Sequence, residues 1–142
     1  MRRYEFTDKG WDYDILLRNK ITVIDGDSGN GKSVLARAMQ SHFVFNKMKA
    51  ELLDYNAYEN TEKVTKTITS YADTLIIIDN ADCILNGDIV DLINNDINNF
   101  YVVFGRKSWG LSATPSHFAE LEQDSTTKKI ALKYSCDVEN WI

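Results

Sequence analysis

Eight consecutive residues near the N-terminus have the types and spacing needed to hold phosphate groups. They are Gly26, Asp27, Ser28, Gly29, Asn30, Gly31, Lys32 and Ser33, and they match the pattern G-x-x-x-x-G-K-[ST] in full. Glycines allow backbone conformations that side chains forbid, so successive amide groups can turn inward and form an anion-binding nest. Lys32 would place its charge on the β- and γ-phosphates, and the Ser33 hydroxyl would bind Mg²⁺. The pattern predicts a loop that binds a nucleoside triphosphate, with ATP and Mg²⁺ as the expected ligands.

A carboxylate at the end of an apolar run is the second candidate for this chemistry. The run from Leu75 to Ile78 is apolar at every position, as expected of a strand at the centre of a parallel sheet, and Asp79 follows it. A carboxylate in that place can hold Mg²⁺ through water, so Ser33 and Asp79 are predicted to share one metal ion. Asp79 could equally be a turn or helix-capping residue, and the glycine-rich segment an ordinary turn with a surface lysine. The occurrence of both motifs in one chain favours the phosphate and metal interpretation.

The elements expected around these motifs alternate along the chain. Strands are predicted at 21–24, 50–55, 74–78 and 100–104, and helices at 32–45, 60–71 and 84–97. Such alternation is typical of right-handed βαβ units, which give a parallel sheet covered by helices on both faces. The predicted phosphate loop leaves the first strand and enters the first helix, whose positive end would face the phosphates.

The C-terminal part of the chain departs from this alternation. Phe118–Glu122 and Lys129–Tyr134 flank a polar turn at 123–128, which predicts an antiparallel hairpin at the edge of the sheet. A short helix over Pro115–Glu122 is the alternative for the first of these segments.

With both motifs present, the chain resembles the P-loop NTPases and, among them, the AAA+-like ATPases. The resemblance covers Ile21 to Arg106 and rests on the additional glycine at Gly29 and on the segment from Leu75 to Asp82, which is similar to a Walker B element. It implies an α/β three-layer sandwich with a central, mainly parallel sheet. It also implies that the strand at 100–104 separates the two motif strands, and that nucleotide binds at their carboxyl ends.

Several positions depart from the pattern of active members of that family. Asn80 occupies the place of the usual glutamate, and an amide can orient a water molecule but cannot accept its proton. Asp82 is the nearest carboxylate that could substitute, although it could also cap the helix that follows. Arg106 could stabilise charge on the γ-phosphate, or be an ordinary surface arginine. The predicted catalytic residues are therefore Lys32, Asp82 and Arg106, and the chain offers no segment for the helical lid of AAA+ proteins.

Composition limits the remaining possibilities. The 142 residues fit a single nucleotide-binding domain spanning 1–142, and the net charge of −5 argues against a general nucleic-acid binder. The two cysteines lack metal-ligand spacing, and the chain has neither a signal-peptide pattern nor an apolar run long enough for a membrane, so a cytoplasmic protein is expected. Two hypotheses remain: a slow Mg²⁺-dependent ATPase, or a nucleotide-dependent switch that binds a protein partner and hydrolyses little.

Overall fold

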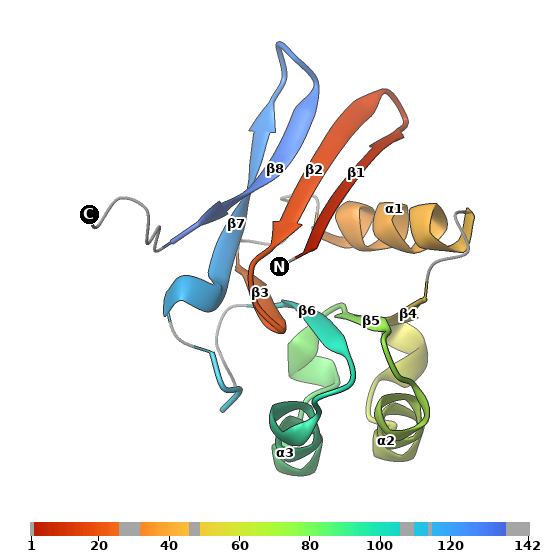
Figure 1. Cartoon of the computed structure of the whole chain (residues 1–142). Helices are drawn as coiled ribbons and strands as arrows, with labels where there is room; N and C mark the ends of the chain where they lie inside the picture. Colours follow the sequence, from red (N-terminus) through yellow and green to blue (C-terminus); the bar gives the residue numbers. More distant parts are fainter. Residues whose placement is uncertain (1, 26–31, 46–48, 106–109, 114, 136–142) are drawn as a thin grey trace.

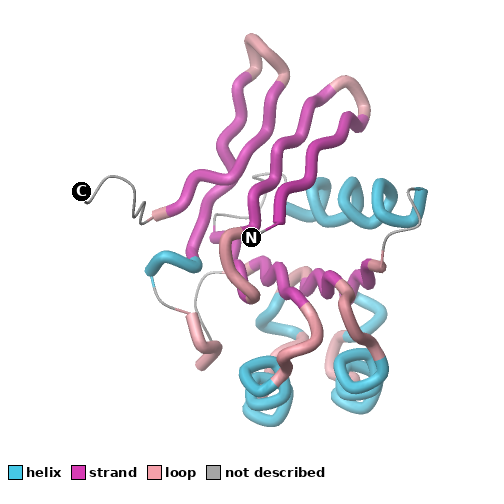
Figure 2. Tube along the Cα trace, viewed as in Figure 1, coloured by secondary structure: helices cyan, strands magenta, loops and turns pink. Residues whose placement is uncertain are grey.

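The chain folds as an α/β structure around one mixed, curled sheet (Figures 1 and 2). The computed structural model describes residues 2–25, 32–45, 49–105, 110–113 and 115–135. Within them the strands are β1 (Arg2–Asp8), β2 (Trp11–Leu17), β3 (Ile21–Asp25), β4 (Ala50–Leu53), β5 (Leu75–Ile78), β6 (Phe100–Phe104), β7 (Phe118–Asp124) and β8 (Lys129–Tyr134). The helices are α1 (Lys32–Phe45), α2 (Thr61–Ser70) and α3 (Gly87–Asn95), with short 3-10 turns η1 (Tyr55–Ala57), η2 (Ala81–Cys83) and η3 (Pro115–His117).

The strand order is β1-β2-β8-β7-β3-β6-β5-β4. From β7 to β4 every neighbouring pair is parallel, which we call the parallel half of the sheet. The remainder consists of two antiparallel hairpins, β1–β2 and β7–β8, joined by a parallel pairing of β2 with β8. As predicted, β6 lies between β3 and β5, because both of these strands pair with it.

Helices cover both faces of the parallel half. α2 and α3 pack against one face, and α1 packs against the other, where the hairpins curl up beside it (Figure 1). Strand side chains alternate between these faces, as the pleat requires. The buried residues on the α1 face include Ile24, Leu75, Ile77, Val102 and Phe104, and those on the α2 and α3 face include Val23, Ile76, Ile78, Tyr101 and Val103. Burial on both faces explains why β5 and β6 are apolar throughout.

A buried amide fixes the amino ends of β5 and β6. The Asn99 side chain is 1% exposed, and its Oδ1 accepts a hydrogen bond from the Thr74 N–H at 3.1 Å. Its Nδ2 donates to the Tyr71 carbonyl at 3.0 Å and to the Asp96 carboxylate at 2.8 Å. These bonds satisfy both kinds of group on the amide, which makes its burial favourable. One side chain thus links β5, β6, the end of α2 and the segment after α3.

Asp96 and Lys20 extend this network from β6 to the residue before β3. The Asp96 carboxylate accepts hydrogen bonds from the Tyr101 hydroxyl and from Asn99, while the Lys20 ammonium group donates to the Ile93 carbonyl at 3.1 Å and to the Asp96 carbonyl. Burial alone would raise the pKa of the Asp96 carboxyl, but the hydrogen bonds that it accepts and the nearby Lys20 charge outweigh burial and lower that pKa. Burial and the bond to Asp96 raise the pKa of the Tyr101 hydroxyl. The end of α3 is thereby tied to the start of β3.

The N-terminal hairpin was not predicted, and it changes where the C-terminal hairpin lies. Lys9 and Gly10 both have positive φ, 50° and 82°, which a two-residue hairpin turn between β1 and β2 requires. Phe6 stacks on Tyr13 at 4.8 Å between ring centroids and on His42 of α1 at 4.5 Å. The predicted β7–β8 hairpin is confirmed, but its predicted place at the sheet edge is wrong because β2 pairs with β8.

Several other predicted elements differ from those observed. The strand predicted over 50–55 ends at Leu53, because the chain turns into η1 at Tyr55. The alternative of a helix over Pro115–Glu122 is wrong, since only the 3-10 turn η3 precedes β7. The helix predicted over 84–97 is shorter, because α3 begins at Gly87 after the Asn86 side chain accepts a hydrogen bond from the Ile89 N–H at 3.0 Å. Asn86 is thus the helix cap.

The buried amide predicts a large effect of its removal. Replacing Asn99 by alanine leaves the buried Thr74 N–H without its acceptor, so the free energy of unfolding should fall by about 1–3 kcal/mol. Urea denaturation followed by circular dichroism measures this change. Asn98→Ala is the control, because the Asn98 side chain is exposed, and it should change stability by less than about 0.5 kcal/mol. Equal effects of the two substitutions would contradict the role given to Asn99.

Candidate phosphate-binding edge of the sheet

The predicted phosphate loop joins β3 to α1. Gly26, Asp27, Ser28, Gly29, Asn30 and Gly31 lie outside the described residues, as does Arg106. β3 ends at Asp25 and α1 begins at Lys32, so the chain passes from strand to helix within the predicted loop. The first turn of α1 contains no acidic residue, whereas those of α2 and α3 contain Glu62 and Asp88. The positive end of the α1 dipole therefore has no acidic side chain of its own helix to offset it.

Asp79 lies at the same edge of the sheet, two strands from the end of β3. Val23 pairs with Val103, and Val103 pairs with Ile78, so the next residues along, Ile24 and Asp79, are level across β6. Two strand spacings separate their backbones by about 10 Å. The alternation of strand side chains places Asp79 on the face of Ile77, which is the α1 face. The fold thus brings the partly buried Asp79 to the side of the sheet where the predicted loop enters α1.

Asn80 has a conformation that accounts for its residue type. Its backbone is left-handed, with φ 58° and ψ 68°, and asparagine is one of the few residues besides glycine that adopts this region readily. Its exposed side chain donates from Nδ2 to the Cys83 Sγ at 3.5 Å. The backbone conformation of the turn after Asp79 is thus sufficient to explain why position 80 is an asparagine.

Asp82 lies in η2, one turn beyond Asp79, and is exposed. Its alternative role as a helix cap is wrong, because Asn86 caps α3 and Asn80 occupies the capping position of η2. Its role as a catalytic carboxylate stays a prediction.

The connection after β4 contacts the connection after β5. The Asp79 N–H donates to the Leu53 carbonyl at 2.9 Å, and the Glu59 N–H donates to the Cys83 carbonyl at 3.0 Å. These bonds bring Asp54, the residue after β4, next to Asp79. Asp54 was not among the predicted site residues, although Leu52-Leu53-Asp54 has the same form as Ile77-Ile78-Asp79, an apolar strand ended by aspartate.

The described donor set is compatible with Mg²⁺ held partly by a ligand. Among the described residues, no group of three or more histidine, cysteine, aspartate or glutamate side chains could hold a metal by itself. Mg²⁺ commonly uses one or two protein carboxylates together with water and substrate phosphates. The partly buried Asp79 carboxylate, a hard oxygen donor, fits that requirement. The side chain of Ser33, the other predicted ligand, lies outside what the structure describes.

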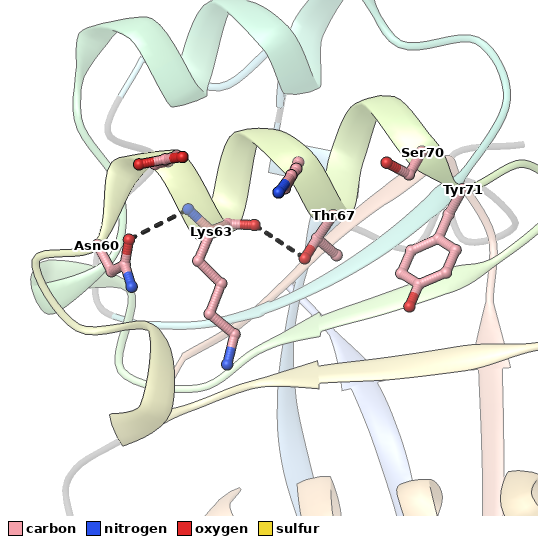
Figure 3. A pocket seen from close by; sticks show the side chains of 7 residues that line it. Asn60, Lys63, Thr67, Ser70 and Tyr71 are labelled. Atoms are coloured by element: carbon pink, nitrogen blue, oxygen red, sulfur yellow. Dashed lines mark hydrogen bonds between the residues drawn. The ribbon is translucent and has the colours of Figure 1, made fainter.

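Two surface hollows in the described part of the chain lie elsewhere. One, of about 500 Å³, follows α2 and is lined only by residues between Asn60 and Tyr71 (Figure 3). The Tyr71 hydroxyl there donates to the Glu51 carboxylate at 3.3 Å. The other, of about 540 Å³, is lined by residues of β1, β2 and β8. Neither includes Asp54 or Asp79.

Comparisons with known proteins do not assign the chain. No family model, curated protein or solved structure matches it. No helix in the described residues is long and apolar enough to cross a membrane.

The left-handed turn at Asn80 predicts the order of stability of its variants. Asn80→Gly should leave the free energy of unfolding nearly unchanged, because glycine adopts this conformation freely. Asn80→Ala should lower it by about 1–2 kcal/mol through strain at positive φ. Chemical denaturation of the three proteins measures the order, and an alanine variant as stable as the glycine variant would contradict it.

Proposed function

We propose that the chain binds ATP with Mg²⁺ at the carboxyl edge of the parallel half of the sheet. The observation that carries the proposal is the alignment of Asp79 with the end of β3 across β6, on the face where α1 begins at Lys32. Open parallel sheets bind ligands at this edge, where strand ends and helix starts converge. The sequence pattern from Gly26 to Ser33 falls between β3 and α1, as phosphate binding requires.

Each residue has a role in this proposal. The loop amides from Gly26 to Gly31 and the start of α1 bind the phosphate oxygens, and Lys32 adds a full positive charge. Ser33 and Asp79 are the residues that hold Mg²⁺. When bound, Mg²⁺ neutralises charge on the β- and γ-phosphates.

We further propose that the parallel half is a P-loop NTPase core. The order β3-β6-β5, with helices on both faces, supports this assignment. The two hairpins depart from a simple three-layer sandwich, because they curl up beside α1 on the face of the sheet opposite α2 and α3 (Figure 2). The expected compartment is the cytoplasm, where ATP and Mg²⁺ are available.

Hydrolysis should be slow, well below the median enzyme turnover of about 10 s⁻¹. Asn80 cannot accept a proton from water, and loss of a general base typically costs a factor of about 10²–10⁴. The hypothesis of a slow ATPase depends on Asp82 as a substitute carboxylate and on Arg106 as a residue that stabilises charge on the γ-phosphate. The second hypothesis, a switch that binds a protein partner and does not hydrolyse ATP, rests on Asn80. A phosphate-release assay on the purified chain distinguishes the two.

Lys32→Ala should weaken ATP binding sharply without unfolding the protein. A charge-assisted contact contributes about 1.5–3 kcal/mol, so affinity should fall roughly 10- to 150-fold. Isothermal titration with Mg²⁺ and ATP measures the change, and Lys66→Ala on the exposed side of α2 is the matched control. If Lys32→Ala and Lys66→Ala bind ATP as tightly as the wild type, the proposed phosphate loop is wrong.

Asp79→Asn should reduce the effect of Mg²⁺ on nucleotide binding. Substitution of a residue that orients bound metal through water typically costs roughly 10-fold or more in metal affinity. Affinity for ATP without metal should stay close to that of the wild type, because Asp79 is not predicted to touch the phosphates. Titrations with and without Mg²⁺ test both statements, and an unchanged Mg²⁺ response would remove Asp79 from the metal site.

A further inference from the structure

β1 forms one of the two edges of the sheet, and it differs from the other edge. The strand order ends at β1 and at β4 (Figure 1). β4 has only four residues, and its Leu52 is 4% exposed, whereas β1 has seven residues that pair with β2 without proline or bulge. Proteins commonly shorten or cover their edge strands, because an uncovered edge can pair with another chain. β1 is therefore the edge to which a further strand can be added.

The hairpin fixes which backbone groups of β1 point away from the sheet. Asp8 and Trp11 flank the two-residue turn, so they form a hydrogen-bonded pair, and such pairs recur at every second residue. The Asp12 N–H donates to the Lys128 carbonyl at 2.8 Å, which agrees with this assignment because it turns residue 12 toward β8. The β1 residues whose backbone groups point outward are therefore Arg3, Glu5 and Thr7. All three are exposed, which leaves this edge open to solvent.

The outer face of the same hairpin carries two carboxylates in opposed positions. Glu5 pairs directly with Asp14, and like charges placed opposite each other destabilise a hairpin. Arg3 offsets part of this repulsion, because its Nε and Nη2 donate to the Asp14 carboxylate at 2.9 and 2.7 Å and its Nε lies 3.1 Å from Glu5 Oε1. These contacts leave Nη1 for another carboxylate. The Glu5 side chain is 66% exposed, so it can accept a second cation from beyond the edge.

We propose that two copies of the chain associate through their β1 edges, as an antiparallel pair about a two-fold axis. Such an interface uses the same residues on both copies. Directly opposed residues share a face of the sheet, and outward-pointing backbone groups must meet outward-pointing groups. An axis near the middle of the strand therefore passes at Tyr4, Glu5 or Phe6. An axis at Tyr4 places Arg3 of each copy opposite Glu5 of the other.

Charge favours the axis at Tyr4 over the two alternatives. Each Glu5 then lies between Asp14 of its own chain and Arg3 of the second copy, so a cation faces the like-charged pair from the open side. An axis at Glu5 would instead oppose two glutamates, and an axis at Phe6 would leave Arg3 without a carboxylate across the interface. A contact between two single strands is small, which is typical of a weak and reversible dimer.

Sedimentation equilibrium at rising protein concentration, without nucleotide, tests the proposal independently of the proposed function. The average mass should rise from 16.2 kDa toward twice that value. Arg3→Glu and Glu5→Arg should each lose the dimer, because like charges then face each other across the axis. An equimolar mixture of the two variants should recover the dimer, because the acidic edge of one then faces the basic edge of the other.

Proline substitutions test the register. The Glu5 N–H points away from β2, so Glu5→Pro removes an edge donor and leaves the hairpin bonds in place. It should abolish the dimer with an unchanged circular dichroism spectrum. Thr7→Pro is the matched control, because the Thr7 backbone also points outward but lies outside the segment 2–6 that pairs about Tyr4. Its dimer should persist.

The outcomes separate the dimer from its register. A chain that stays at 16.2 kDa at every concentration overturns the proposal, and so does a dimer that survives both charge reversals. A mixture of the charge variants that stays monomeric overturns the pairing of Arg3 with Glu5, and this result does not depend on whether the proline variants fold. Equal loss of the dimer in folded Glu5→Pro and Thr7→Pro overturns the axis at Tyr4.

Discussion

The side-chain amide of Asn99 fixes the alignment on which the candidate site depends. Asn99 directly precedes β6, and its buried amide joins this point to the Thr74 N–H before β5 and to the end of α2. A buried amide tolerates neither a missing donor nor a missing acceptor, so the pairing of β5 with β6 is set at this end. A slip of one residue would turn each strand side chain to the opposite face. The alignment of Ile24 with Asp79 at the far end therefore follows from hydrogen bonds at the near end.

Helix α1 is fixed in place by packing on two sides, against the parallel half of the sheet and against the hairpins. Leu35, Ala36 and Met39 are fully buried or nearly so, because the helix lies between the parallel half of the sheet and the hairpins. His42 in its last turn stacks on Phe6 of β1. Since α1 starts at Lys32, packing along its length determines where the predicted phosphate loop must end. The hairpins thus help to hold α1, and with it the end of the predicted loop, although none of their residues is among the predicted site residues.

The sequence predicted the parallel half well because its strands are apolar on both faces and end at clear signals. β3, β5 and β6 are short apolar runs, and α1 has the bounds that its apolar spacing indicates. The N-terminal hairpin was missed although Tyr4, Phe6, Tyr13 and Ile15 alternate with polar residues, because charged side chains dominate its outer face. The position of Asp54 beside Asp79 was not predicted, because β4 is only four residues long and its register against β5 depends on contacts distant in sequence.

The conformation of Asn80 links local backbone geometry to the chemistry available at the site. A residue directly after Asp79 must adopt positive φ here, and glutamate would carry a strain of about 1–2 kcal/mol that asparagine largely avoids. A glutamate directly after Asp79 would therefore destabilise the turn that leads into η2 and α3. The neighbouring strand has no such restriction, because Asp54 begins a turn that its own side chain stabilises. In this fold a carboxylate is therefore accommodated more easily at the end of β4 than directly after Asp79.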